Sequence, residues 1–128
     1  MAKVTIQNGE LRISLSLIDR ALTFESSFRI PLSHITNAYV SNIGDLELQD
    51  ERSGQAFNLQ GHLKIAGIYH DRSGLIFCDI GGSDCLVIET RGERFPRIAI
   101  EVQEGADPNQ LAHEIVAALP DEGTSSAS

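Results

Sequence analysis

Apolar residues recur at helical spacing near the end of the chain and at strand spacing almost everywhere else. The helical stripe consists of Leu111, Ile115, Ala118 and Leu119. Asp107 precedes it as an N-cap, Pro108 suits the first helical position, and Pro120 has no N–H to continue the ladder. We therefore expect one capped helix over residues 107–119, whose single apolar stripe packs against strands.

The clearest strand signal lies at the start of the chain. Asn8 and Gly9 both tolerate positive φ, and this dipeptide is the strongest short signal for a two-residue hairpin turn. Centring the turn there pairs apolar residues across the two strands, Ile6 with Leu11 and Val4 with Ile13. That register agrees with the alternation within each strand, so we expect a hairpin whose apolar face turns inward.

Further strands follow along the chain. Phe28 and Ile30 alternate into Pro31, which marks a strand edge or end. Other strand-like runs occupy residues 63–69, 75–80 and 97–103. At 85–90 Val87 stands between Leu86 and Ile88, so we expect that strand to be covered on both faces. Residues 16–24 fit either a short helix or a bent strand. Residues 41–62 are rich in turn formers and predict a long loop of a functional or mobile kind.

Composition indicates one globular domain over residues 1–120, followed by a small, polar and disordered tail at 121–128. The net charge of −8 and the scattered basic residues argue against nucleic acid as a partner. Arg91, Arg94 and Arg97 alternate with Glu89, Glu93 and Glu101, which favours a hairpin with cross-strand charge pairs over a phosphate site. No segment predicts a signal peptide or a membrane span, so a cytoplasmic location is expected.

Two cysteines flank a glycine-rich turn. A two-residue turn at Gly81 and Gly82 would place Cys78 directly opposite Cys85, at a spacing that permits a disulfide. A cytoplasmic chain keeps thiols reduced, so two buried or half-buried thiols are the favoured interpretation and a disulfide is the alternative. Two cysteines alone do not complete a zinc site.

Four histidines raise the question of an enzyme or a metal site: His34, His62, His70 and His113. Ser33 precedes His34, but neighbours on an extended chain point to opposite sides and form no nucleophile–base pair. His62 and His70 share strand parity and would bind a common metal only with a third ligand, which the sequence does not supply. We therefore expect surface histidines, no catalytic residue, no metal and no cofactor.

Six short stretches, in their order and spacing over residues 3–119, resemble an uncharacterised family of bacterial proteins with a pleckstrin-homology-like (PH-like) fold. They are residues 15–20, 30–35, 66–69, 86–90, 97–102 and 107–108. Residues 44–62 depart from the family pattern in carrying less Gly and Pro. The resemblance implies a mainly β barrel or sandwich of about seven antiparallel strands in two near-orthogonal sheets, capped by one C-terminal α-helix.

The resemblance implies neither an enzymatic activity nor a known ligand. Lipid-binding proteins of this fold hold inositol phosphates with basic residues around the first hairpin, where this chain has only Lys3 and Arg12 beside Glu10. We therefore do not expect phosphoinositide binding.

The leading hypothesis is a non-enzymatic protein-interaction or assembly module, which binds a protein partner or a second copy through a sheet edge or a groove beside the helix. The alternatives are a small apolar ligand in a cavity lined by Phe24, Phe57 and Phe77, or a histidine-based metal or hydrolytic site. The sequence assigns no individual binding residue.

Overall fold

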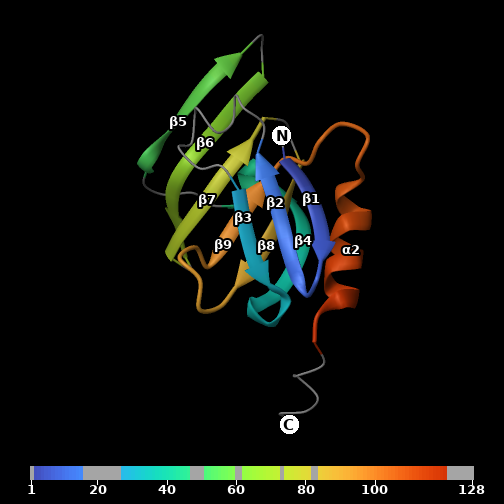
Figure 1. Cartoon of the computed structure of the whole chain (residues 1–128). Helices are drawn as coiled ribbons and strands as arrows, with labels where there is room; N and C mark the ends of the chain where they lie inside the picture. The colour runs from blue at the N-terminus through green and yellow to red at the C-terminus, as the bar shows by residue number, and fades with distance from the viewer. Residues whose placement is uncertain are drawn as a thin grey trace.

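The computed structural model describes residues 2–15, 27–46, 51–59, 62–72, 74–81 and 84–120. Within these ranges, residues 43–44, 51–59 and 62–64 are described by their backbone alone. Within these ranges, nine strands form one three-stranded and one six-stranded sheet, followed by a single α-helix. The small sheet lies across one half of the large sheet, and the helix stands at the side of the two (Figure 1). The expectation of a mainly β fold with one C-terminal helix is therefore confirmed.

The small sheet is a meander of β1 (Ala2–Gln7), β2 (Glu10–Leu15) and β3 (Ser27–Pro31). Its first turn is the predicted one, because Asn8 and Gly9 have φ values of 52° and 77°. The predicted register is also confirmed, with Ile6 opposite Leu11 and Val4 opposite Ile13. Strand β3 ends at Pro31, as the sequence indicates.

The large sheet contains β4 (Ile35–Asn42), β5 (Glu51–Leu59), β6 (His62–Asp71), β7 (Gly74–Ile80), β8 (Asp84–Thr90) and β9 (Arg97–Ile100). Their order across the sheet is β4-β8-β9-β7-β6-β5. Two short 3-10 helices flank β4: η1 (Leu32–His34) precedes it and η2 (Ile43–Leu46) follows it.

The prediction of one long loop over residues 41–62 is wrong. Strand β4 continues to Asn42, and β5 occupies nine residues of the segment. Among the described strands, β5 is the edge of the large sheet and pairs with β6 alone. An edge strand needs a partner on one side only, so it tolerates the polar and glycine-containing sequence that resembles a loop.

The predicted hairpin between the two cysteine-containing strands is also wrong. Strand β9 lies between β7 and β8, parallel to the first and antiparallel to the second. Residue Ala99 therefore stands opposite Cys78 on one side and Val87 on the other, and the two cysteines are free thiols. This parallel pair also contradicts the expectation of antiparallel strands throughout, and the strands outnumber the seven expected.

Strand β9 enters the middle of the sheet because both of its faces are apolar. Ile98, Ala99 and Ile100 are all buried, which is the pattern of a strand covered on both sides rather than of a half-exposed hairpin strand. The same holds for β8, where Leu86, Val87 and Ile88 are fully buried, as their sequence predicts.

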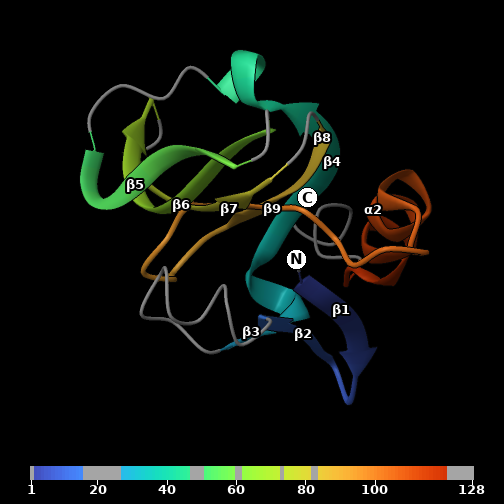
Figure 2. The same ribbon diagram turned by 90° about the horizontal axis from the view of Figure 1, so that it is seen from above.

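The large sheet has a hydrophobic core on each face. The first core lies under the small sheet and the helix; its most buried large side chains include Leu11, Ile13, Ile30, Phe77, Leu86, Ile88, Ile98, Ile100 and Ile115. The second core is smaller and contains Leu46, Ile65, Tyr69, Ile76, Cys78, Ile80, Cys85, Val87 and Ala99. It lies on the opposite face, where the β5 end of the sheet curls over together with η2 (Figure 2).

Helix α2 (Pro108–Ala118) closes the open side of the first core. Asp107 caps it by accepting a hydrogen bond from the Asn109 N–H at 3.0 Å, as predicted. Ala112 and Ile115 are its buried residues, and the helix runs beside β4 and β1 (Figure 2). The predicted helix is therefore confirmed to within one residue at each end.

Two sequence predictions fall outside the described residues: the short helix or bent strand at 16–24 and the disordered tail at 121–128. Across the part of the chain that is described, no helix is long and apolar enough to cross a membrane.

The docking of α2 can be tested with two adjacent residues of opposite environment. Ile115 is fully buried, whereas Val116 is 46% exposed. We expect Ile115→Ala to lower the free energy of unfolding by about 2–5 kcal/mol, because it leaves a cavity in the first core. Val116→Ala should change it by about 0.5 kcal/mol or less. Equilibrium unfolding in urea measures both; equal effects would contradict the packing of the helix.

The two thiols should be unreactive in the folded protein. Burial raises the pKa of Cys78 strongly and that of Cys85 to about 11, and the thiolate is the reactive form. Near pH 8, close to the ordinary cysteine pKa of about 8.5, a thiol-specific chromogenic reagent should label both cysteines rapidly in denaturant and slowly without it. Rapid labelling of the native protein would contradict this burial.

Candidate interaction site

The outer edge of β3 offers unpaired backbone groups. The Leu32 N–H donates to the Gly9 carbonyl at 2.9 Å, which sets the alternation of hydrogen bonds along the β2–β3 ladder. Phe28 and Ile30 then bond to β2, and the N–H and C=O groups of Arg29 point away from the sheet. Among the described residues no strand pairs with this edge, which lies on the side of the small sheet away from α2 (Figure 1).

A pocket of about 170 Å³ opens beside this edge, between the two sheets. Its lining side chains are Phe28, Ile30, Glu93, Arg94, Phe95 and Ile98. The apolar ones come from the inward face of β3, from β9 and from the loop that joins β8 to β9. The two charged ones both come from that loop, so the lining of the pocket is mostly apolar and partly charged.

The loop between β8 and β9 is held firmly against the rest of the protein. The Thr90 hydroxyl donates to the Phe95 carbonyl at 2.6 Å, and the Thr90 N–H donates to the Pro96 carbonyl at 2.8 Å. The Arg91 side chain donates to the Ser33 carbonyl at 3.1 and 3.3 Å. The Phe95 ring packs against Phe28 and Phe77. These contacts fix the position of the loop beside the pocket.

Charged side chains surround the pocket and the edge. The Arg94 guanidinium lies over the Phe95 ring, 4.7 Å from its centre, and Glu93 pairs with His34 at 2.7 Å. On the outer face of the small sheet, Arg29 pairs with Glu10 at 3.4 Å, and its side chain is 64% exposed. An exposed pair such as that of Arg29 with Glu10 contributes little to stability.

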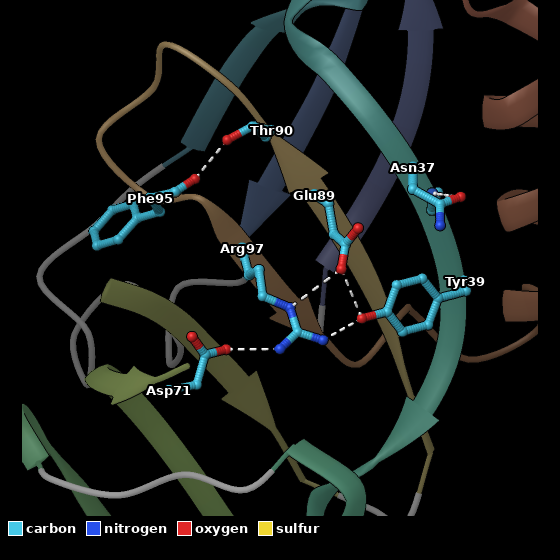
Figure 3. Close-up of polar contacts among 8 residues, drawn as sticks. Asn37, Tyr39, Asp71, Glu89, Thr90, Phe95 and Arg97 are labelled. Carbon is cyan, nitrogen blue, oxygen red and sulfur yellow. Dashed lines mark hydrogen bonds and ion pairs between the residues drawn. The ribbon is translucent and has the colours of Figure 1, made fainter. Parts of the chain in front are cut away.

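A second polar cluster holds the start of β9, on the opposite face of the large sheet (Figure 3). The Arg97 guanidinium donates to the Asp71 carboxylate at 2.8 Å and to the Tyr39 hydroxyl, and lies 3.5 Å from Glu89. The Tyr39 hydroxyl donates to Glu89 at 3.0 Å. The cluster joins β4, β6, β8 and β9, so it fixes the strand that follows the pocket loop.

The groups of the Arg97 cluster bind one another across four strands, so we assign this cluster a structural role. Asp71 is only 1% exposed, and the arginine compensates its buried charge. Burial raises the pKa of Tyr39 above its ordinary value; its bond to Glu89 acts in the same direction, and Arg97 opposes both. Glu89 lies opposite Arg97 and forms with it one cross-strand charge pair of the kind that the sequence favours.

The structure does not bring the histidines together. His34 pairs with Glu93, and His113 is exposed on α2. His62 and His70 lie near opposite ends of β6, and since a strand rises about 3.3 Å per residue, this single strand keeps them too far apart to share an ion. Within the described part of the chain, no three His, Cys, Asp or Glu residues are placed to hold a metal ion.

The apolar cavity expected among Phe24, Phe57 and Phe77 is not tested by the described residues. Phe77 is fully buried in the first core and packs edge-on against Phe28, with ring centres 4.9 Å apart. Phe24 and the side chain of Phe57 lie outside the described residues. The aromatic residues that line the pocket beside β3 are Phe28 and Phe95.

The arginines of the proposed charge-paired hairpin have separate partners. Arg97 belongs to the cluster described above, Arg91 bonds to η1, and Arg94 lies at the pocket. Near the first hairpin, Arg12 donates to Gln7 at 2.9 Å and to Glu10 at 3.5 Å, and Lys3 is exposed.

Sequence reasoning assigned no binding residue and missed the pocket. The available signals were Pro31, which indicates a strand edge, and Phe95, an aromatic residue within a charged turn. Neither signal shows that the turn folds back onto β3.

Comparisons with protein-family models, with curated proteins and with solved structures give no match.

The Arg97 cluster should make stability depend on alkaline pH through Tyr39. The folded protein holds the Tyr39 proton more tightly than the unfolded chain does. The stabilisation that protonated Tyr39 gives the folded state is therefore complete below pH about 10 and is lost as pH rises through the raised pKa of Tyr39. Tyr39→Phe should cost about 1 kcal/mol at neutral pH, and its deficit should shrink above pH about 10. Urea unfolding at several pH values checks this; a deficit that does not vary with pH would contradict it.

Proposed function

We propose that this protein is a non-enzymatic interaction module that binds an extended segment of a protein partner at the free edge of β3. The observation that carries the proposal is the position of the pocket directly beside backbone groups that point away from the sheet. An added strand gains main-chain hydrogen bonds along the edge, and alternate side chains reach a pocket that selects among sequences.

The size of the pocket favours a side chain over a whole small ligand. An engineered apolar cavity of about 150 Å³ admits benzene, so a pocket of about 170 Å³ suits one leucyl or phenyl side chain. Sites for cofactors and drug-sized ligands usually measure roughly 300–1,000 Å³. We therefore prefer a peptide segment with one apolar anchor to the alternative of a small apolar ligand.

We also propose that the fold is of the PH-like class and that the protein acts in the cytoplasm. The three-stranded meander packed on a larger sheet and the C-terminal helix beside them support the resemblance. The parallel pairing of β7 with β9 departs from it. The proposed site is the β3 edge and not the groove beside the helix, the other location that the sequence suggested. The pocket lies on the side of the small sheet that faces away from α2.

Backbone recognition at β3 is testable with a matched pair of substitutions at Arg29. Arg29→Pro removes the outward N–H while leaving the β2–β3 hydrogen bonds in place, since proline is tolerated on an edge strand. Arg29→Ala keeps that N–H and removes only the side chain. With the neutral peptide Gln-Val-Gln-Leu-Gln-Val-Gln as probe, we expect Arg29→Pro to lose binding and Arg29→Ala to retain it, as measured by NMR titration.

The wild-type protein supplies a second readout that needs no substitution. Peptide binding should slow hydrogen exchange at the Arg29 amide, whereas the amides of Phe28 and Ile30, which already face β2, serve as internal controls. Exchange at Arg29 that the peptide leaves unchanged, or peptide binding that survives Arg29→Pro in a folded variant, would overturn the proposal.

A further inference from the structure

We infer that the partner's anchor, the side chain that enters the pocket, is a tyrosine. This inference rests on the proposed function and adds the identity of the residue that the pocket selects. It follows from the juxtaposition, in one pocket, of the phenyl rings of Phe28 and Phe95 with the carboxylate of Glu93. The rings favour an aromatic body for the anchor, and the carboxylate favours a hydrogen-bond donor at its tip.

Two of the pocket residues belong to a cluster of three aromatic rings. Phe28, Phe77 and Phe95 pack in edge-to-face or tilted pairs, with ring centres between 4.9 and 6.1 Å apart. Phe77 and Phe95 are buried, whereas Phe28 is only half-buried and lines the pocket. Aromatic rings in such pairs attract one another by more than their buried area accounts for. A fourth ring from the partner therefore extends the cluster and binds there more tightly than an aliphatic side chain does.

The carboxylate of Glu93 gives the pocket a hydrogen-bond acceptor. Its Oε2 atom bonds to His34 Nδ1 at 2.7 Å, and its side chain is 27% exposed. An ionised carboxylate only accepts, and its two oxygens have about four lone-pair sites. The bond to His34 therefore leaves capacity for a donor from the partner. Hydrogen bonds to a charged group are stronger than neutral ones, so this acceptor discriminates between anchors with and without a donor.

Tyrosine meets both conditions, and other side chains meet them less well. Leucine and phenylalanine have no donor. Lysine and arginine are disfavoured, because Arg94 lines the same pocket and already lies over the Phe95 ring, 4.7 Å from its centre. Serine and threonine leave much of the pocket of about 170 Å³ unfilled. A single ring suits this volume, since an apolar cavity of about 150 Å³ admits benzene, and the two fused rings of tryptophan need more room.

An added strand brings the anchor to this pocket. Successive residues of a strand point to opposite faces, so the partner residue opposite Arg29 shares the outer face with the Arg29 side chain. Its two neighbours point inward, beside Phe28 and Ile30, which both line the pocket. The tyrosine therefore lies next to the partner residue opposite Arg29, and the residues on either side of the tyrosine face outward.

The test compares three peptides that differ in the anchor alone. They are Gln-Val-Gln-Tyr-Gln-Val-Gln and its counterparts with Phe or Leu in the central position, each titrated against the full chain by NMR. We expect the phenylalanine peptide to bind about fivefold more tightly than the leucine peptide, the size of one aromatic pair. The tyrosine peptide should bind about tenfold more tightly than the phenylalanine peptide, the size of one hydrogen bond to a charged group.

Two substitutions at the His34–Glu93 pair locate the preference for the hydroxyl. Glu93→Ala removes the acceptor and should bring the tyrosine and phenylalanine peptides to equal affinity. His34→Ala is the matched control, because it breaks the same pair but leaves the carboxylate, and it should keep the preference for tyrosine. Circular dichroism of each variant verifies that the fold is retained.

The unsubstituted protein gives a readout that does not depend on any variant. In its complex with the tyrosine peptide, the protons of the tyrosine ring should show nuclear Overhauser contacts to the rings of Phe28 and Phe95. A bound tyrosine without these contacts would overturn the inference, because its ring would then lie outside the pocket.

The outcomes separate this inference from the proposed function. Equal binding of the three peptides, lost on Arg29→Pro, would overturn the tyrosine anchor and leave the β3 site standing. A preference for tyrosine over phenylalanine that persists in Glu93→Ala would overturn the role of the carboxylate. Absence of binding by all three peptides would overturn both proposals. Selective binding of the tyrosine peptide that Arg29→Pro leaves intact would overturn strand addition and leave the selectivity of the pocket standing.

Discussion

The whole structure depends on the burial of β9 on both of its faces. Ile98 and Ile100 complete the first core, and Ala99 lies against the second. On both sides the backbone of β9 pairs with neighbouring strands, β7 and β8. A strand with apolar side chains on both faces is stable only inside a sheet that is covered on both sides. The small sheet and α2 cover one face, and the curled β5 end of the large sheet covers the other.

This constraint also builds the candidate site. To enter the sheet between β7 and β8, the chain must leave β8, turn through residues 91–96 and return. Thr90 and Arg91 tie that turn to its own backbone and to η1, while Arg97 anchors the start of β9 on the far face. The turn is thereby brought over the inner face of β3, where Phe95 completes the pocket. The pocket is thus a consequence of the strand order, and its polar wall comes from residues that a surface turn tolerates at little cost.

The parts of the fold that local chemistry dictates were predicted from the sequence. Asn8 and Gly9 determine the first hairpin and its register, and Asp107 begins the helix, because turn and cap residues act on their immediate neighbours. The segment 41–62 was misassigned because β5 owes its strand conformation to pairing with β6 rather than to its own composition. The site was recognised only in fragments, as a strand ending at Pro31 and as a charged turn.

Periodicity and local capping are enough to predict the mainly β class, the first hairpin, the capped helix and the two-sided burial of β8. Three features arise only when distant parts of the chain pack together: β9 separates β7 from β8, Cys78 and Cys85 do not face each other, and Phe95 meets Phe28. These contacts join residues far apart in the chain, and alternation within a strand reveals which face is buried but not which strand lies beside it.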